Sequence, residues 1–169
     1  MLRLIAGSEY PDNGDILREG KLSWPLGFSG GFSPNLTGEE NLRFICRIYD
    51  ANIPYVSEYV KDFAELGDFF YEPIRNYSNG MKSRLAFGLS MAIDFEVILV
   101  DEILGVGDSS FRKKCTEHFK KKSEESSIIM VSHEMNTIRN FCESILLFDK
   151  GGITVFDDVE EAITAYGNL

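Results

Sequence analysis

Val97-Ile98-Leu99-Val100-Asp101-Glu102 is the stretch that decides the fold. Four β-branched or leucine residues in a row predict a strand that is buried on both faces of a parallel sheet. Similar runs occupy Ser127 to Val131 and Ser144 to Phe148, and the segments between them have helical patterns, at about Ser109 to Lys122 and Glu134 to Phe141. This order predicts a β-α-β-α-β core with right-handed crossovers.

The residues before this core have the spacing of helices. Thr37 has the position of an N-cap and Glu40 completes a capping box, which predicts a helix to about Tyr49. A second helix is expected from about Pro54. A third is expected from about Asn79, with the apolar positions Met81, Leu85, Leu89 and Ala92 on one face.

Shorter elements are expected at both ends of the chain. Met1 to Ala6 resembles the tail of a helix, residues 15–19 and 21–26 are candidate strands, and the glycine-rich residues 27–35 predict a loop. Near the end, Gly151-Gly152 predicts a hairpin into a strand at 153–156, followed by an amphipathic helix. We therefore expect three regions: a mixed N-terminal part (1–36), an inserted helical subdomain (37–92) and the α/β core (93–169).

The composition excludes several classes of protein. The formal net charge of -10 argues against a nucleic-acid binder, which normally presents net positive potential. No run approaches the roughly 18 to 20 apolar residues of a membrane span, and the first residues are too quickly polar for a signal peptide, so we expect a cytosolic chain. Cys46, Cys115 and Cys142 have neither zinc-site nor disulfide spacing and are expected to behave as small buried hydrophobes.

Two carboxylates follow the run at 97–100. Ligands of an open parallel sheet bind at the carboxyl ends of its strands. Adjacent strand residues point to opposite sides, so Asp101 is placed to hold Mg²⁺ through water, and Glu102 to orient or deprotonate an attacking water. The alternative is a charged turn after a strand.

The two histidines are expected to lie in different environments. His133 follows the strand expected at 127–131, where a neutral imidazole could donate a hydrogen bond to a γ-phosphate oxygen. The alternative is a half-buried histidine that caps a helix. His118 lies among five lysines of one helix, which predicts a solvated face.

Tyr77-Ser78-Asn79-Gly80-Met81 opens a predicted helix. A serine hydroxyl, small residues and the backbone N–H groups of a helix N-terminus form a cradle for phosphate, which the helix dipole favours. The alternative is an ordinary N-cap, because serine and asparagine both cap helices well.

These motifs occur in the order found in ABC-type ATPases. Asn76 to Ala86 resembles the ABC signature and its helix, and Val97 to Glu102 resembles the Walker B strand with its catalytic glutamate. Gly107-Asp108 resembles the D-loop, and Val131-Ser132-His133 the H-loop. Three further segments, 23–32, 36–38 and 62–68, are similar to the ATPase subunits that energise export of capsular and related surface polysaccharides.

The resemblance implies cofactors, partners and residue roles. ATP and Mg²⁺ would be bound, two copies of the ATPase would face each other head to tail, and the helical region with the glycine-rich loop would contact a membrane permease at the cytoplasmic face of the bacterial inner membrane. The residues implied are the general base Glu102, the Mg²⁺ carboxylate Asp101, the γ-phosphate sensor His133, the dimer-coupling Asp108 and the nucleotide contacts Ser78, Asn79, Gly80 and Met81.

One departure from the family concerns the P-loop. The motif Gly-x-x-x-x-Gly-Lys-Ser/Thr does not occur in the sequence. The nearest match, at Gly20-Lys21, has Asp15 in place of the first glycine and Leu22 in place of the hydroxyl residue. In the family the P-loop precedes a helix similar to Leu2 to Gly7, so we expect this chain to start just after the P-loop and to bind ATP poorly by itself.

Two other departures concern the Q-loop and the signature. The chain contains no glutamine, and Phe28 stands where many ABC ATPases carry the Q-loop glutamine. Asn79 and Met81 replace a usual glycine and glutamine of the signature, while Ser78 and Gly80 are retained. The retained pair keeps a phosphate cradle plausible.

The sequence thus predicts an α/β fold of the P-loop NTPase (ABC ATPase) type, with a parallel-sheet core and an inserted helical subdomain but without the N-terminal P-loop portion. The expected function is that of the ATP-hydrolysing subunit of an ABC exporter of capsular or related polysaccharide. The alternatives are a non-catalytic remnant or interaction module, and a non-transport ABC ATPase acting on DNA or the ribosome. The acidic charge counts against the last of these.

Overall fold

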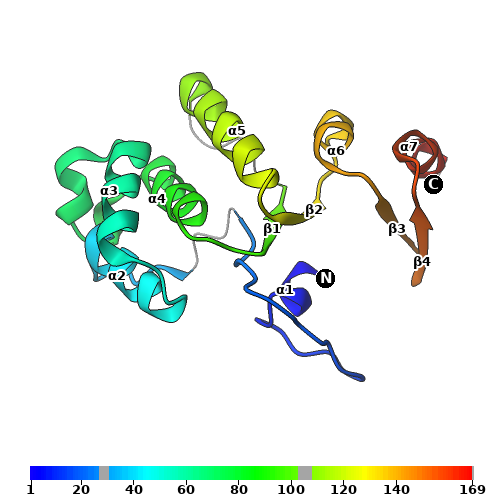
Figure 1. The fold of residues 1–169 in the computed structure, drawn as a ribbon, viewed down its shortest axis with the longest axis horizontal. Coiled ribbons are helices and arrows are strands. Elements are labelled where there is room, and N and C mark those ends of the chain that lie inside the picture. The colour runs from blue at the N-terminus through cyan, green and yellow to red at the C-terminus, as the bar shows by residue number, and fades with distance from the viewer. Residues whose placement is uncertain (27–30, 103–107, 169) are drawn as a thin grey trace. The chain divides into compact units, whose positions relative to one another are not determined.

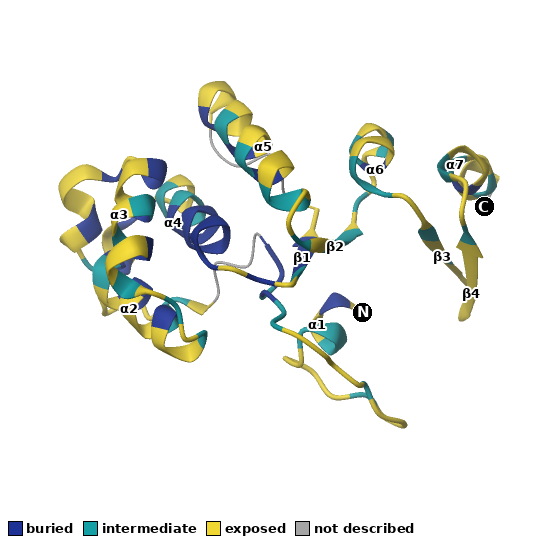
Figure 2. Ribbon diagram, in the orientation of Figure 1, coloured by how far each residue is buried: buried dark blue, intermediate teal, exposed yellow. Residues whose placement is uncertain are grey.

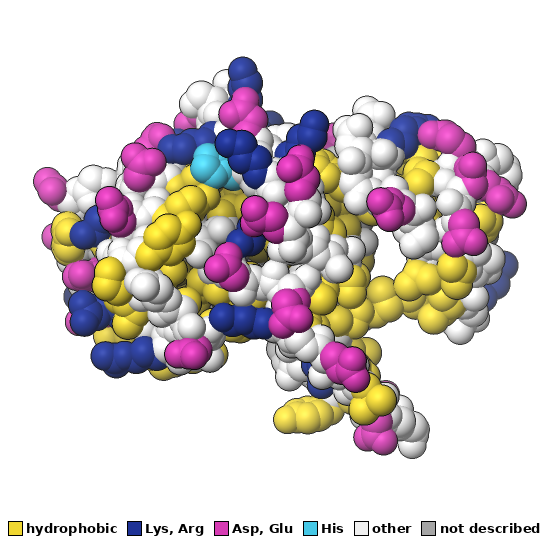
Figure 3. Space-filling model, in the orientation of Figure 1, with side chains coloured by type: hydrophobic (Ala, Val, Ile, Leu, Met, Phe, Trp, Pro, Cys, Tyr) yellow, Lys and Arg dark blue, Asp and Glu magenta, His cyan; other side chains and the backbone are white. Residues whose placement is uncertain are grey.

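The computed structural model describes residues 1–26, 31–102 and 108–168 (Figure 1). The chain divides into two compact units, Met1–Ile129 and Met130–Leu169. Within the described residues, no helix combines the length and the apolar character needed to cross a membrane. Charged side chains of both signs are interspersed over the face of the molecule shown in Figure 3.

Three helices make up the helical part of the first unit. They are α2 (Gly38–Ile48), α3 (Ile53–Ala64) and α4 (Asn79–Ala92), and α3 packs against both of the others (Figure 1). Two short 3₁₀ helices, η2 (Gly67–Tyr71) and η3 (Ile74–Asn76), connect α3 to α4. The predicted loop at 72–77 therefore contains a helical turn.

The predicted capping box of α2 is confirmed. Glu40 N donates to Thr37 Oγ1 at 3.1 Å, and Thr37 N donates to Glu40 Oε2 at 2.9 Å. Two backbone N–H groups at the helix start are satisfied in this way. The start of α3 is capped by Asn52, whose side chain accepts from Tyr55 N at 3.0 Å.

More of α4 is buried than the single face that the sequence predicted. Every residue from Leu85 to Ala92 is buried (Figure 2). The helix lies between α3 and α5 (Ser109–Ser123), so its second half is covered on more than one side. A Cβ added at Gly88 would lie 3.2 Å from Cδ1 of Phe63, which shows how closely α3 approaches α4.

Strand β1 (Val97–Asp101) is the buried centre of the α/β part, as predicted. It pairs with β2 (Ser127–Val131). On the segment predicted as a strand at 21–26, Leu22 and Leu26 form isolated parallel bridges with Val97 and Val100, and Leu26 N donates to the carbonyl of Leu99 at 2.7 Å.

The candidate strand at 15–19 is wrong. Its middle residue Leu17 is 92% exposed, and no strand is assigned there. Instead Arg18 donates to the carbonyls of Ile5 and Leu4 at 2.7 and 2.6 Å, at the end of the short helix α1 (Leu2–Ile5). This segment therefore caps a helix end with a side chain and contributes no backbone to a sheet.

The prediction that β2 is buried on both faces is also wrong. Its three central residues are half-buried and both of its end residues are exposed. Among the described strands β2 has one neighbour, β1, so it lies at the edge of its sheet. An edge position leaves side chains in contact with solvent even when the sequence is apolar throughout.

The second unit is built around a hairpin. Strands β3 (Ile145–Asp149) and β4 (Gly152–Phe156) pair antiparallel, and positive φ angles at Lys150 and Gly151 form the tight turn between them. Helices α6 (Met135–Phe141) and α7 (Val159–Gly167) complete the unit, and α7 packs on both strands. Because half-buried and exposed residues are mixed along β3, burial on both of its faces was wrongly predicted.

Candidate functional site

The signature turn is the N-terminus of α4. Ser78 is the N-cap, and its Oγ accepts from Met81 N at 3.2 Å. Asn79 and Gly80 are exposed, and a Cβ added at Gly80 would meet only Ser78 Oγ, at 3.7 Å. The N-cap geometry is confirmed, and the surface at Gly80 is open next to the positive end of the helix dipole.

Tyr77 anchors this turn, a role that the sequence analysis missed. The tyrosine is 5% exposed, its hydroxyl donates to the carbonyl of Phe69 at 2.6 Å, and burial raises its pKa to about 12. At Gly38 an added Cβ would overlap the Tyr77 hydroxyl. Glycine at the first position of α2 was the only sequence signal for this close approach.

The two carboxylates after β1 differ in backbone conformation. The strand ends at Asp101, and Glu102 follows with φ of 61°, in the left-handed region. Strand alternation therefore does not explain their orientation, which corrects the reason given from the sequence. Non-glycine residues held at positive φ are strained and are concentrated at functional sites, and both carboxylates are exposed.

Asp108 is the N-cap of α5. One carboxylate oxygen, Oδ1, accepts from Phe111 N at 3.0 Å, from Ser110 N at 3.0 Å and from Ser110 Oγ at 2.7 Å. The bond from Phe111 N is the main reason why the pKa of Asp108 falls to about 2. Its companion in the predicted D-loop, Gly107, lies outside the described residues, as does Phe28 of the predicted Q-loop position.

Arg84 connects the signature helix to Asp108, and the sequence analysis did not single it out for this. Its Nη2 lies 2.9 Å from Asp108 Oδ2, and its Nη1 lies 3.4 Å from Glu65 Oε2 at the end of α3. The helix that begins at the predicted signature turn, 78–81, is thus ion-paired to Asp108 through Arg84. Contacts between residues 24 positions apart leave no periodic signal in a sequence.

His133 belongs to the second unit. It is exposed and lies between β2 and α6, where Ser132 Oγ accepts from Glu134 N at 3.0 Å. Glu134 has the N-cap position of α6 and its side chain makes no capping bond. The alternative of a half-buried histidine is wrong in its burial, because His133 is exposed. The role of His133 at a γ-phosphate stays a prediction.

His118 was wrongly predicted to lie on a solvated face. Its Nδ1 is 2.8 Å from the hydroxyl of Tyr59, and its ring lies 4.9 Å from that of Phe63. Burial lowers the pKa of His118. Lys121 and Lys114, each about one turn away on α5, also lower this pKa, after burial.

The described residues fit Mg²⁺ as a cofactor bound together with a nucleotide. Among them, no cluster of three or more His, Cys, Asp or Glu could hold a metal by itself. Mg²⁺ in phosphoryl-transfer sites usually takes one or two carboxylates and completes its shell with phosphate oxygens and water. The exposed carboxylate of Asp101 at the end of β1 suits this arrangement.

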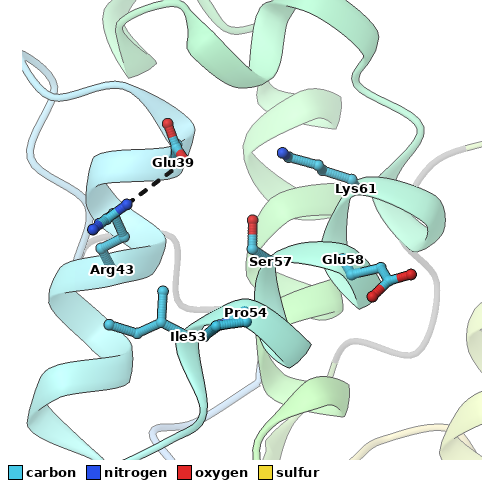
Figure 4. Close-up of a pocket in the computed structure, with 7 residues that line it drawn as sticks. All are labelled: Glu39, Arg43, Ile53, Pro54, Ser57, Glu58 and Lys61. Atoms are coloured by element: carbon cyan, nitrogen blue, oxygen red, sulfur yellow. Dashed lines mark ion pairs between the residues drawn. The ribbon is translucent and has the colours of Figure 1, made fainter.

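A pocket of about 540 Å³ lies between α2 and α3 (Figure 4). Arg43 and Glu39 of α2 form an ion pair with 3.9 Å between Nη1 and Oε1, and Lys61 extends from α3 toward the same space. A hydrogen bond with Tyr71 raises the pKa of Lys61. The lining residues are Glu39, Arg43, Ile53, Pro54, Ser57, Glu58 and Lys61.

No family model matches the chain, but curated proteins do. Over 169 residues it is 46% identical to the capsule polysaccharide export ATP-binding protein CtrD of Neisseria meningitidis, covering 100% of this chain and 78% of the relative. It is 45% identical to the ATP-binding protein BexA of Haemophilus influenzae, with 98% and 76% covered. The polysialic acid transport ATP-binding protein KpsT of Escherichia coli is 43% identical, with 98% and 75% covered.

Solved structures agree on the fold. The chain has a TM-score of 0.68 to a metal-chelate type ABC transporter in an inward-facing conformation, with 18% identity, covering 99% of this chain and 73% of that one. The dimeric ATP-binding cassette MJ0796 bound to ADP and phosphate gives a TM-score of 0.63 at 22% identity, with 80% and 62% covered. The fold is that of an ABC ATPase, and the chain belongs to the family of ABC-type ATP-binding proteins of capsule polysaccharide export.

Proposed function

We propose that this chain is the ATP-hydrolysing subunit of an ABC exporter of capsular or related cell-surface polysaccharide. The observation that carries the proposal is the identity of 43 to 46% to the capsule and polysialic acid proteins over nearly the whole chain. Relatives named for teichoic acid export are 32 to 34% identical. The substrate class is therefore expected to be nearer to capsular glycans than to teichoic acids.

In this proposal, each predicted site residue has a distinct task. Glu102 accepts the proton of the attacking water, Asp101 holds Mg²⁺ through water, and His133 donates to the γ-phosphate. When bound, Mg²⁺ would neutralise charge on the phosphates. The exposed carboxylates after β1 and the strained backbone of Glu102 support the first two assignments.

The signature residues 78–81 are proposed to contact nucleotide held by a second ATPase subunit. The open surface beside Gly80 and the positive end of α4 support this contact. The related cassette MJ0796 is a dimer in its structure with ADP and phosphate. We therefore propose a homodimer, in which Asp108 lies at the subunit boundary.

The helical region is proposed to contact the membrane permease. Phe44 and Ile48 lie one turn apart on α2 and are exposed, and Tyr55 of α3 is exposed as well. The same two helices form the pocket lined by Glu39, Arg43 and Lys61. Exposed apolar side chains on helices that also carry a charged pocket suit a short amphipathic segment of a partner, and this contact would hold the ATPase at the cytoplasmic face of the inner membrane.

The test measures MgATP hydrolysis by the subunit assembled with its permease in lipid vesicles, over a range of MgATP concentrations wide enough to saturate a site that lacks the P-loop motif. Glu102→Gln should lower kcat by about 100-fold or more, because it removes a general base while keeping the shape of the side chain. Glu125→Gln, which neutralises an exposed carboxylate near the end of α5, is the matched control and should behave as wild type. Hydrolysis by Glu102→Gln at the wild-type rate would overturn the assigned base.

The export function is tested separately. A cell that lacks its own capsule export ATPase should regain surface polysaccharide when it receives the wild-type subunit with its permease, and should not regain it with Glu102→Gln. Hydrolysis without restored export would contradict the proposed substrate class and leave the ATPase assignment in place.

A further inference from the structure

Three helices of the first unit meet at the guanidinium group of Arg84. The side chain starts on α4 and is only 20% exposed. It contacts Asp108 at the start of α5 at 2.9 Å and Glu65 at the end of α3 at 3.4 Å. Arginine suits this position because its planar fork can bind two carboxylates in fixed directions.

Phe111 holds the guanidinium from a further side. The Arg84 Cζ lies 4.2 Å from the centre of the Phe111 ring, and that ring is buried. The backbone N of Phe111 also donates to Asp108 Oδ1. Arg84 therefore contacts both the carboxylate that caps α5 and the ring of the first turn that this carboxylate caps, and the stacking adds a cation–π attraction.

Lys114 extends the network to the end of α3. Its Nζ lies 2.6 Å from Glu65 Oε1 and also donates to the carbonyl of Phe63 at 3.1 Å. The ion pair with Lys114 is the main reason why the pKa of Glu65 is lowered. Glu65 itself ends α3 with a left-handed backbone, φ 53°. Positive and negative side chains thus alternate through successive ion pairs, from Lys114 through Glu65 and Arg84 to Asp108.

The two carboxylate oxygens of Asp108 bind different partners. Oδ1 accepts the bonds that cap α5, and Oδ2 pairs with Arg84. Rotation of this carboxylate would break bonds on both sides. Ser78, the N-cap of α4, lies six residues before Arg84, and all residues between them are part of the same helix. The turn at 78–81 and the turn at 108 are therefore connected through one rigid helix and one ion pair.

We propose that Arg84 is a positioning residue for ATP hydrolysis. It makes the signature turn at Ser78 and the predicted D-loop residue Asp108 move as one body. The proposal rests on the proposed function, in which both turns face nucleotide at the subunit boundary. A shift imposed on either turn by nucleotide would be passed to the other through Arg84. Arg84 touches no reacting atom in this scheme.

A purely structural role makes a different prediction. Ion pairs with partly exposed partners contribute little to stability, since water screens them and both side chains lose freedom. Loss of Arg84 should then leave the rate of hydrolysis unchanged as long as the protein stays folded. A positioning role instead requires the rate to fall, because small displacements of groups around a reacting centre are costly.

The first experiment compares Arg84→Met with Arg84→Lys in the exporter assembled with its permease. Arg84→Met should lower kcat for MgATP by about 10- to 100-fold while KM for MgATP changes less than about threefold. Arg84→Lys should recover part of kcat, because it keeps the charge but loses the planar fork. Lys113→Met is the matched control and should match wild type, because Lys113 is an exposed residue of α5 that pairs with Glu117 at 4.0 Å.

The second experiment is a double-mutant cycle with Asp108→Asn, which keeps an N-cap side chain but removes the charge that Arg84 contacts. If the two residues act as a unit, Arg84→Met combined with Asp108→Asn should lower kcat no further than the worse single variant. Unchanged kcat in Arg84→Met, or effects of the two substitutions that multiply, would overturn the proposal.

A measurement without nucleotide separates this proposal from the proposed function. In the free chain, Arg84→Met should speed hydrogen exchange at the Phe111 amide by about three- to tenfold, because the capping carboxylate loses its second partner. If the wild-type exporter hydrolyses no ATP, the proposed function fails, and the exchange rate still tests the link. Hydrogen exchange at the Phe111 amide of Arg84→Met at the wild-type rate would overturn the proposed link between Arg84 and Asp108.

Discussion

Replacing Phe63 by alanine tests the packing that positions the signature helix. The ring is 1% exposed and lies nearly parallel to Tyr59 and Phe87, with centroids 5.8 and 5.7 Å away. It meets Phe111 and His118 edge to face, at 5.4 and 4.9 Å. One side chain of α3 therefore contacts aromatic groups of α4 and α5.

The expected loss follows from these contacts. Phe→Ala changes in cores cost about 3 to 5 kcal/mol, which includes the lost transfer free energy and the cavity left behind. Aromatic pairs contribute about 0.5 to 1.5 kcal/mol each beyond burial, and the measured range for Phe→Ala already includes such contacts, so the four at Phe63 place it in the upper part of that range. Because rings from α4 and α5 border the site on different sides, it cannot collapse around the smaller side chain. We expect a loss of about 4 to 5 kcal/mol.

The measurement is a urea titration followed by tryptophan fluorescence. The chain has one tryptophan, Trp24, which lies in the same unit as Phe63 and packs against Tyr49 and Phe95 at 5.4 and 5.5 Å. The control is Phe44→Ala, at a ring that is 54% exposed, and it should cost less than about 1 kcal/mol. A loss below about 1.5 kcal/mol for Phe63→Ala would refute the packing argument.

Three further outcomes are expected from the same unit. Asn41→Ala should cost about 2 to 3 kcal/mol by urea titration, because the buried Asn41 amide bonds Ser33 through both its N–H and its C=O and also bonds the Thr37 carbonyl; a cost below about 0.5 kcal/mol would contradict this. Thr37→Ala should cost about 1 kcal/mol and Thr37→Ser almost nothing; equal losses would speak against the capping box. The pKa of Asp108 is lowered to about 2, so its stabilising contribution is complete above its ordinary pKa and is lost as pH falls toward 2. In Asp108→Asn the free energy of unfolding should fall less between pH 4 and 2 than it does in wild type. The same pH dependence in both proteins would exclude this role.

Local patterns were sufficient to predict most of the elements. The capping box at Thr37 and Glu40, the helix after Asn79 and the buried strand at 97–100 are all present. Each depends on groups within a few residues of one another, or on a continuous run of apolar residues. For the same reason Ser78 could be recognised as an N-cap from its neighbours alone.

Burial was less predictable than element type. The apolar runs that became β2 and β3 have similar composition to β1, yet they are only partly buried. Burial depends on what packs against a strand, and that partner is distant in sequence. His118 shows the same limit, because the Tyr59 hydroxyl that bonds it lies on another helix.

The sequence by itself determined the family, because the residues at 76–86, 97–102 and 131–133 and the spacing between them are what the chain shares with ABC ATPases. It also determined the turn at Ser78 and the end of the strand at Asp101, since both depend on local backbone bonding. Only the tertiary structure decided how the motifs are joined. Arg84 reaches Asp108 because α4 packs beside α5, and such packing brings together side chains whose separation along the chain carries no periodic signal.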